Sequence, residues 1–314
     1  ELEERIRKVE QEAALLRRAA ASIPGKVVFL RGTRPHNSVD WTTPVVQPPS
    51  QATNTLRYLA YGLPGQTYRC YIEKDSPGPA TMGRQLCLLD PAQPQSRPRL
   101  LLDAGNGWIG GAMSVSYDGG SLYFAMAPEG DPFFHIYRLA VAGGKPEQLT
   151  HGTFQDVDPD ILPDGRIVFC STRFGGREEY HAYLASTLFT MGPQGENIQP
   201  LTYHVVNDRE PRVTAAGSIV FVRQDNFFMN AKIETQIHQI HLNGTGGMVL
   251  LGQDREGSGY DRFTAHEKFP KAIGFLAPSE LNFKRNGNAF GCPTPLPDGR
   301  VVVLRTLYQF GEAL

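Results

Sequence analysis

The sequence predicts an all-β protein, folded as a β-propeller of about six four-stranded blades with the last blade incomplete. Three observations lead to this prediction: short apolar runs rich in Val, Ile and Phe, a glycine turn ahead of several of them, and the spacing of those turns. The 314 residues include 33 Gly and 24 Pro, yet 40% are hydrophobic. This composition suits many short strands joined by tight turns around a substantial core.

Four of the apolar runs directly follow a turn that contains glycine. They are "SLYFAM" (121–126) after "YDGG", "SIVFVR" (218–223) after "TAAG", and "RIVFCS" (166–171) and "RVVVLR" (300–305) after "LPDG". Pro, Asp and Gly in this order are typical of a type I turn that ends in a left-handed glycine. We therefore interpret the repeated Leu-Pro-Asp-Gly-Arg mainly as architecture.

The spacing of the turns indicates a repeat. The turn glycines Gly119, Gly165, Gly217 and Gly299 lie 46, 52 and 82 residues apart. The last interval is close to two units of about 41 residues, and repeats of ~40–45 residues indicate propeller blades. We predict blades at 26–103, 112–150, 160–202 and 212–251, a degenerate blade at 255–290, and an incomplete one starting near 292.

The first 24 residues differ from the rest of the chain. Their apolar residues recur three or four positions apart among Glu, Arg and Lys, which predicts a short amphipathic helix that ends at "IPG" (23–25). This helix could be a linker or capping helix, or it could be one helix of a coiled coil. We divide the chain into this helix (1–24) and a propeller domain (25–314) that is incomplete at its C-terminus, because the final unit stops after two strands.

Charge and cysteine content narrow the classes of function. The net charge is −1, with 31 basic and 32 acidic residues, so no overall field favours nucleic acid or an anionic membrane. No apolar stretch approaches the ~20 residues of a transmembrane segment. The four cysteines form neither C-x-x-C nor the haem-attachment motif C-x-x-C-H, and we expect no cofactor. His238 and His241, three apart on a predicted strand, point to opposite faces, and we expect no metal site.

Charged residues cluster just ahead of two predicted inner strands. Asp156 and Asp158 precede one of these strands, and Asp208, Arg209 and Glu210 precede the next. Because the inner strands of a propeller converge on a central channel, these groups could surround its mouth and bind a cation or a polar ligand. The alternative is structural, since an Asp before Pro can cap a turn through backbone N–H groups. The sequence does not decide whether the carboxylates converge.

Two polar loops between the second and third strands of their blades form the predicted rim. They are "GGREEYHAY" (175–183) and "RQDNFFMNAK" (223–232). Because binding residues concentrate on such loops, we add Arg173, Glu179 and His181 to the candidate ligand-binding residues. The alternatives are a solvated loop for the first, and aromatic side chains folded back onto the blade for the second. No G-x-S-x-G, P-loop or H-E-x-x-H motif points to catalytic residues.

The third predicted blade also carries a family resemblance. "DP" (158–159), "LPDG" (162–165), "IVFCSTR", "LFTM", a glycine turn and "LT" (201–202) together resemble the TolB-type β-propeller repeat. In that family a Pro opens the inner strand, Pro-Asp-Gly turns into the second strand, and Leu-Thr closes the blade. "DVDPDILPDGRIVFCSTR", followed by "LFTMGPQGENIQPLT" and "PTPLPDGRVVV", is similar to the propeller domain of hydrazine synthase alpha-subunit-like proteins over most of 105–314.

The resemblance implies one domain of a large protein. In hydrazine synthase itself the redox chemistry uses c-type haems, and the missing C-x-x-C-H departs from that pattern. We therefore expect a non-catalytic binding or scaffold domain of a larger, periplasmic or otherwise extracytoplasmic protein. Its partner would be another protein or other domains of the same polypeptide, not nucleic acid. The alternative is the propeller domain of a multidomain redox enzyme, or a propeller lyase or hydrolase with a site at the channel mouth.

Overall fold

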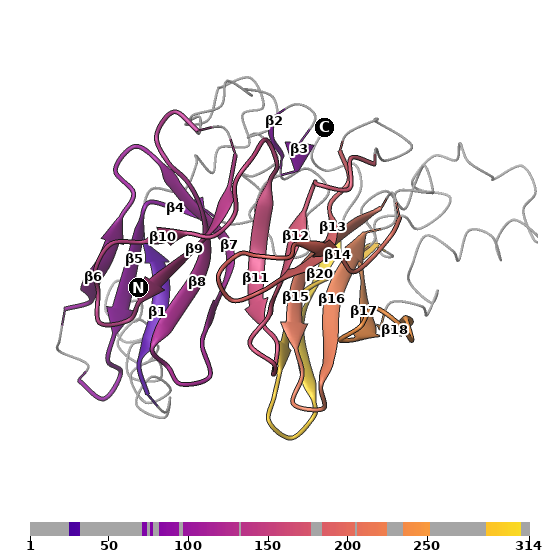
Figure 1. Cartoon of the computed structure of the whole chain (residues 1–314). Helices are drawn as coiled ribbons and strands as arrows, with labels where there is room; N and C mark the ends of the chain where they lie inside the picture. The colour runs from indigo at the N-terminus through magenta and orange to yellow at the C-terminus, as the bar shows by residue number, and fades with distance from the viewer. Residues whose placement is uncertain are drawn as a thin grey trace, which may run out of the picture.

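The described part of the chain is built from β-strands (Figure 1). The computed structural model describes residues 25–31, 71–73, 76–77, 82–93, 97–131, 133–176, 184–204, 206–224, 235–251 and 287–308. All regular secondary-structure elements within these ranges are β-strands, which confirms the all-β prediction. The predicted N-terminal helix (1–24) lies outside the described residues. No helix long and apolar enough to cross a membrane occurs in the described ranges.

The first two sheets come from the N-terminal half of the described residues. The first has the order β1-β5-β6, with β1 at Val27–Arg31, β5 at Gln85–Leu89 and β6 at Arg99–Asp103. The second has the order β10-β9-β8-β7-β4, with β4 at Met82–Gly83, β7 at Trp108–Val115, β8 at Ser121–Ala127, β9 at His135–Ala140 and β10 at Glu147–Gln148. A small separate sheet pairs β2 (Tyr71–Glu73) with β3 (Ser76–Pro77).

The next two sheets repeat one four-stranded antiparallel pattern. The third comprises β11 (Asp156–Ile161), β12 (Ile167–Ser171), β13 (Thr187–Met191) and β14 (Gln199–Pro200). The fourth comprises β15 (Asn207–Val213), β16 (Ser218–Gln224), β17 (Thr235–His241) and β18 (Met248–Leu251). The hairpin of β19 (Gly287–Pro295) and β20 (Val301–Tyr308) joins the fourth sheet through a parallel bridge between Thr235 and Ala289.

Four strands begin earlier in the chain than we predicted. The predicted starts were 112, 160, 212 and 292, whereas β7, β11, β15 and β19 begin at Trp108, Asp156, Asn207 and Gly287. For the last three strands, the error came from placing the proline at the start of the strand. Pro159, Pro211 and Pro293 lie inside their strands, next to a β-bulge where the ladder is already interrupted, so the missing N–H costs no pairing there.

The Leu-Pro-Asp-Gly turns have the predicted conformation. Gly165 has φ +87° and donates its N–H to the Leu162 carbonyl at 2.9 Å, and Gly299, also at φ +87°, does the same to Leu296 at 3.0 Å. A Cβ at either glycine would meet no atom, so the positive φ rather than crowding requires glycine. The turns thus connect the first strand of a sheet to the second.

The core lies between the sheets. Alternate residues of β8 illustrate this, because Leu122 and Phe124 pack in a cluster with the first sheet, whereas Tyr123 and Ala125 pack in a cluster with the third. Side chains on a strand alternate between its two faces, so a sheet with neighbours on both faces needs apolar residues at consecutive positions. This accounts for unbroken apolar runs such as β12, which is buried at every position.

Four strands that each open a hairpin lie side by side. We call these strands, β7, β11, β15 and β19, the lead strands. β11 contacts both β7 and β15, and β15 contacts β19. Figure 1 shows β7, β11 and β15 near one another. The charged residues singled out in the sequence lie on two of these lead strands.

Candidate functional site

The lead strands share one backbone irregularity. Asp158, Glu210 and Cys292 have φ values of +56°, +51° and +50°, and in β7 the corresponding residue is Gly111 at +75°. Each lies at a register shift of its strand. Positive φ is rare outside glycine and costs free energy. Its recurrence in three lead strands indicates that the conformation is needed, and at Asp158 and Glu210 it coincides with side chains that reach a neighbouring lead strand.

Carboxylate groups at these bulges connect the lead strands. Asp158 Oδ1 accepts a hydrogen bond from the Ala112 N–H of β7 at 2.7 Å, and Oδ2 accepts one from the Glu210 N–H of β15 at 3.2 Å. Glu210 in turn accepts from the Cys292 N–H of β19 through Oε2 at 2.6 Å. Two buried carboxylates therefore link four successive lead strands.

A further carboxylate strengthens the connection between β11 and β15. Asp160 Oδ2 accepts a hydrogen bond from the Val213 N–H at 2.7 Å. Burial raises the pKa of Asp160, against the effects of the nearby Arg212 charge and this hydrogen bond. We call Asp158, Asp160 and Glu210 the carboxylate ties. Each tie accepts a backbone N–H of a neighbouring lead strand, so the ties hold the lead strands together.

The environment of Glu210 suits a group that changes charge near neutral pH. Burial raises its pKa to about 7, and the adjacent Asp158 charge acts in the same direction. The Cys292 N–H and the charges of Arg212 and Arg209 oppose this shift. Arg209 is only 1% exposed, and within the described ranges its guanidinium nitrogens have no hydrogen-bond partner. Its charge acts to lower the pKa of Glu210.

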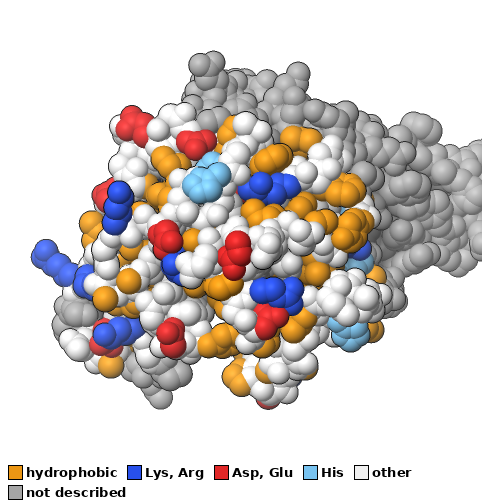
Figure 2. Space-filling model, in the orientation of Figure 1, with side chains coloured by type: hydrophobic (Ala, Val, Ile, Leu, Met, Phe, Trp, Pro, Cys, Tyr) orange, Lys and Arg blue, Asp and Glu red, His pale blue; other side chains and the backbone are white. Residues whose placement is uncertain are grey.

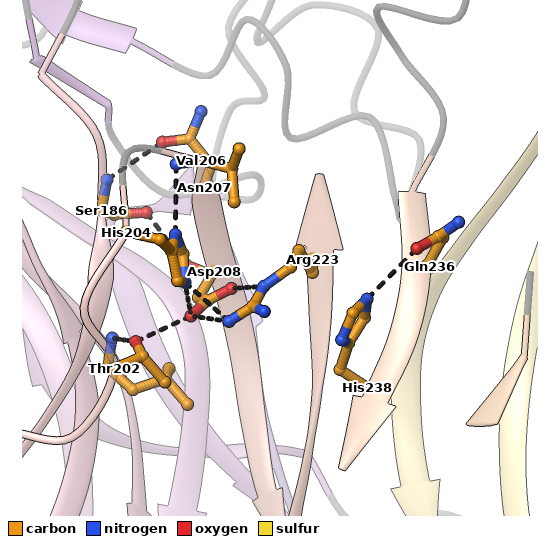
Figure 3. Close-up of polar contacts among 10 residues, drawn as sticks. Ser186, Thr202, His204, Val206, Asn207, Asp208, Arg223, Gln236 and His238 are labelled. Atoms are coloured by element: carbon orange, nitrogen blue, oxygen red, sulfur yellow. Dashed lines mark hydrogen bonds and ion pairs between the residues drawn. The ribbon is translucent and has the colours of Figure 1, made fainter. Parts of the chain in front are cut away.

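Asp208 lies at the centre of a second polar cluster, shown in Figure 3. Arg223 donates from Nε to Oδ1 at 2.8 Å and from Nη2 to Oδ2 at 3.0 Å. His204 Nε2 and Thr202 Oγ1 lie 2.7 and 2.8 Å from Oδ2. Burial acts to raise the pKa of Asp208, but the His204 hydrogen bond and the Arg223 charge outweigh it, and the pKa is lowered. The cluster holds an ionised carboxylate.

The pair of His204 and Asp208 has the residue types of a catalytic dyad but the bonding of a structural one. The Val206 N–H donates to His204 Nδ1 at 3.1 Å, so Nδ1 is an acceptor. Nε2 lies 2.7 Å from Asp208 Oδ2 and 2.6 Å from Arg223 Nη2. Both ring nitrogens are therefore used within the fold, and neither is available to exchange a proton with a substrate.

Asp156 repeats this arrangement one sheet earlier. It lies 52 residues before Asp208, the same interval that separates the turn glycines Gly165 and Gly217. Ser171 Oγ donates to its Oδ1 at 2.6 Å, and Arg173 donates from Nε to Oδ1 at 3.2 Å and from Nη2 to Oδ2 at 2.7 Å. Each of the two sheets thus buries one aspartate that binds one arginine.

The structure divides the predicted site residues between the carboxylate ties and the two aspartate clusters. It brings Asp158 and Glu210 together, whereas Asp156 and Asp208 belong to separate clusters. We predicted the acidic residues just ahead of the inner strands, but all of them lie within β11 or β15, because those strands continue through their prolines. Glu179 and His181 lie outside the described residues. Within the described ranges, no three His, Cys, Asp or Glu side chains are placed to hold a metal ion.

The fold can be compared with known proteins. No protein-family model and no curated protein sequence matches the chain.

Its structural neighbours are TolB-like propeller proteins.

A protein assigned as TolB from Agrobacterium tumefaciens is 23% identical, with 53% of this chain and 56% of that chain covered and a TM-score of 0.43. Hydrazine synthase of Kuenenia stuttgartiensis is 14% identical, with 71% and 38% covered and a TM-score of 0.49. TolB from Acinetobacter baumannii is 14% identical, with 54% and 49% covered and a TM-score of 0.36. The chain thus spans about half of each TolB chain and 38% of the hydrazine synthase chain.

The two aspartate clusters lie next to an exposed aromatic pair. Phe174 and Tyr203 are 40% and 68% exposed, and their rings meet edge to face with centroids 6.4 Å apart. Phe174 follows Arg173 in the chain, and Tyr203 precedes His204. We call Arg173, Phe174, Tyr203, His204 and Arg223 the arginine edge. Figure 2 shows basic, histidine and acidic side chains among hydrophobic ones in the upper part of the described surface.

Sequence reasoning missed several residues of these clusters, including Thr202. Its Oγ1 accepts the Leu188 N–H at 2.9 Å and donates to Asp208. Thr150 Oγ1 accepts the Ile136 N–H at the same distance in the preceding sheet. A signal was available, because the Leu-Thr pairs recur 52 residues apart, like Asp156 and Asp208. The other missed residues are Asp160, Ser171, His204, Arg223 and Cys292.

His238 gives a prediction for stability in acid. Burial lowers its pKa to about 4, and the Arg223 charge acts in the same direction. Because the unfolded chain binds this proton near pH 6.5, the stability contributed by the neutral ring is present above that pH and is lost as the pH falls towards 4. Between pH 7 and 4, the wild type is expected to lose about 2 kcal/mol more unfolding free energy than His238→Gln, after allowing for solvent screening.

Urea unfolding at a series of pH values measures this difference. His241→Gln, an exposed change on the same strand, serves as the matched control and is expected to follow the wild type. If the unfolding free energies of the wild type and His238→Gln changed by the same amount between pH 7 and 4, the prediction would be contradicted.

Proposed function

We propose that the chain is a non-catalytic binding or scaffold domain, a β-propeller of about six blades within a larger extracytoplasmic protein. Its partner is another protein or other domains of the same polypeptide, and contact is made through the arginine edge. The observation that supports this most directly is the contrast between the charged groups of the lead strands, which are used in bonds between strands, and the exposed aromatic pair beside them.

The carboxylates and the histidine of the clusters have few free positions for chemistry. Both oxygens of Asp158 and both oxygens of Asp208 accept hydrogen bonds, and both nitrogens of His204 are used. Phe174 and Tyr203, by contrast, present large apolar surfaces to solvent beside basic side chains. Aromatic residues and arginine are enriched where proteins bind one another. A rigid sheet assembly with such an edge suits docking.

Glu210 supports a second candidate, an enzyme with a site at the mouth of the channel. Its pKa of about 7 is in the range of an efficient general acid or base. The lyase, hydrolase and multidomain redox readings all require such a group to meet a substrate. Glu210 is buried, however, and its Oε2 is bound by the Cys292 N–H.

Site-specific photo-cross-linking tests the binding function. A photoreactive phenylalanine analogue replaces Tyr203 in the full-length protein, expressed in its natural cells. Tyr117 is the matched control, because it is 71% exposed and its hydroxyl bonds a backbone carbonyl, as that of Tyr203 does. Tyr117 lies in the turn between β7 and β8, at the opposite ends of the strands. We expect a defined cross-linked peptide from position 203 and not from position 117.

The same experiment separates the two candidates. Glu210→Gln removes the titrating group and is expected to leave the cross-link from position 203 within about two-fold of the wild type, since the arginine edge does not include it. Cross-links that are equally abundant at both positions, or absent at both, would contradict the binding function. An active preparation that loses activity on Glu210→Gln would favour the enzyme.

A further inference from the structure

We propose that the arginine edge binds an acidic segment of its partner, with carboxylates at two positions and apolar residues between them. This inference rests on the proposed binding function and specifies the chemistry of the partner. It follows from the orientation of two ion pairs, the unused donors of two arginines, and an exposed aromatic pair whose members adjoin Arg173 and His204 in the chain.

The two ion pairs are oriented with their negative ends inward. The side chains of Asp156 and Asp208 are fully buried, whereas those of Arg173 and Arg223 are 15% and 24% exposed. Each pair is neutral overall, but the arginine is the partner whose side chain reaches solvent. The field just outside such a pair is positive, and it is screened less where the protein excludes water. The edge therefore attracts anionic groups.

The two arginines also leave the same donors unused. Each binds its aspartate through Nε and Nη2, and Arg173 uses Nη2 for the His151 carbonyl as well, at 2.8 Å. Neither Nη1 has a hydrogen bond to any described residue. An arginine Nη1 carries two N–H groups, which suit a carboxylate oxygen and cannot accept from a donor. Each arginine can thus donate to an acidic side chain of the partner.

The geometry between the two arginines favours apolar contact. The Phe174 and Tyr203 rings meet at a centroid distance of 6.4 Å, so the aromatic pair spans from the Arg173 segment to the His204 segment beside Arg223. The Arg173 guanidinium lies 4.6 Å from the centre of the Phe154 ring, which fixes its plane. Because Phe174 follows Arg173 in the chain and Tyr203 precedes His204, which contacts Arg223, a segment that reaches both arginines can also contact the aromatic pair.

The charge of the neighbouring sheet limits the site to the third and fourth sheets. Asp131 lies at the start of the connection into β9, where it accepts from the Phe133 N–H at 2.9 Å and contacts His135 at 3.3 Å. Burial lowers the pKa of His135, so this corner carries the aspartate charge without an equal positive charge. An acidic segment is repelled there and is held at the arginine edge.

Selection from a random peptide library tests the proposed chemistry. A display library of random 12-residue peptides is selected on the immobilised full-length protein, and binders that also bind Tyr203→Glu are removed. We expect the remaining peptides to be enriched in Asp and Glu at two positions that flank apolar residues. Their affinity is expected to fall several-fold between 50 and 300 mM salt, because the contact is electrostatic in part.

Three exposed substitutions measure the effect of charge without disturbing the buried pairs. Tyr203→Glu places a negative charge on the edge and is expected to weaken a selected acidic peptide by about ten-fold or more. Tyr203→Lys removes the same ring but keeps the positive field, so it is expected to weaken binding less than Tyr203→Glu. Tyr117→Glu, at the opposite ends of the strands, is expected to change the affinity by less than about two-fold.

The outcomes distinguish this inference from the proposed function. Selected peptides that lack acidic residues, an absence of binders, or equal losses for Tyr203→Glu and Tyr203→Lys would overturn the acidic partner. None of these results would remove a cross-link from position 203, which tests docking itself. Loss of that cross-link specificity would overturn the binding function and this inference with it.

Discussion

Replacing Asp158 by alanine is expected to lower the unfolding free energy by about 4 kcal/mol, because two backbone N–H groups, one buried and one partly buried, lose their acceptor. These are the N–H groups of Ala112 and Glu210, on the lead strands before and after β11. Alanine also adopts a positive φ less readily than aspartate, which adds to the loss. Urea unfolding followed by tryptophan fluorescence and circular dichroism measures the change.

Asp164→Ala provides the matched control for this prediction. Asp164 lies in the exposed turn that follows β11, and its bonds are local, to the Arg166 N–H and side chain. Its loss is expected to cost about 0.5 kcal/mol. If Asp158→Ala costs no more than Asp164→Ala, the carboxylate ties do not hold the sheets together.

Glu210→Gln is expected to become more stable relative to the wild type by about 3 kcal/mol as the pH rises from 5 to 8. The folded pKa of about 7 lies above the ordinary value of 4.5. The stability that Glu210 contributes is therefore fully present below pH 4.5 and is lost as the pH rises through 7. Glutamine has no proton to lose in this range, and its side-chain oxygen can still accept from the Cys292 N–H.

The measurement compares urea unfolding of both proteins at several pH values. The quantity compared is the difference in unfolding free energy between the two proteins. This difference is needed because the titration of His238 changes the stability of both proteins with pH in the opposite direction between pH 4 and 6.5. Glu147→Gln, which alters an exposed pair with Arg138, is the control and is expected to stay parallel to the wild type. In Asp158→Ala the effect is expected to be smaller, since the repelling charge is gone. A constant difference between Glu210→Gln and the wild type from pH 5 to 8 would contradict the assignment.

The parts of the fold that depend on local chemistry could be predicted from sequence. Glycine at the end of Leu-Pro-Asp-Gly adopts a positive φ whatever surrounds it, so the turns at Gly165 and Gly299 were correct. The extent of the lead strands was wrong, because proline normally marks the edge of a strand. Only the bulge beside Pro159 and Pro211, which is a property of the paired strands, makes proline acceptable inside them.

The candidate site was predictable in composition but not in connectivity. Asp158 and Glu210 were both placed just ahead of inner strands, with their convergence left open, and the structure brings them together. Their partners could not be inferred, because Cys292 lies 82 residues after Glu210 and is reached from a neighbouring lead strand. Arg223 lies only 15 residues after Asp208, yet their contact depends on the register of β15 against β16. Register is set by packing across the whole sheet.

The carboxylate ties have a consequence for how such a chain can change its length. The ties accept hydrogen bonds from the backbone N–H groups of four residues that share no side-chain chemistry, Ala112, Glu210, Val213 and Cys292. Every residue except proline offers this donor. A unit that is duplicated, deleted or exchanged would therefore find a docking partner without a compensating substitution in its new neighbour. The contact between units thus depends on the position of a backbone N–H and not on the side chain that carries it. The exposed edges can therefore diverge from one repeat to the next.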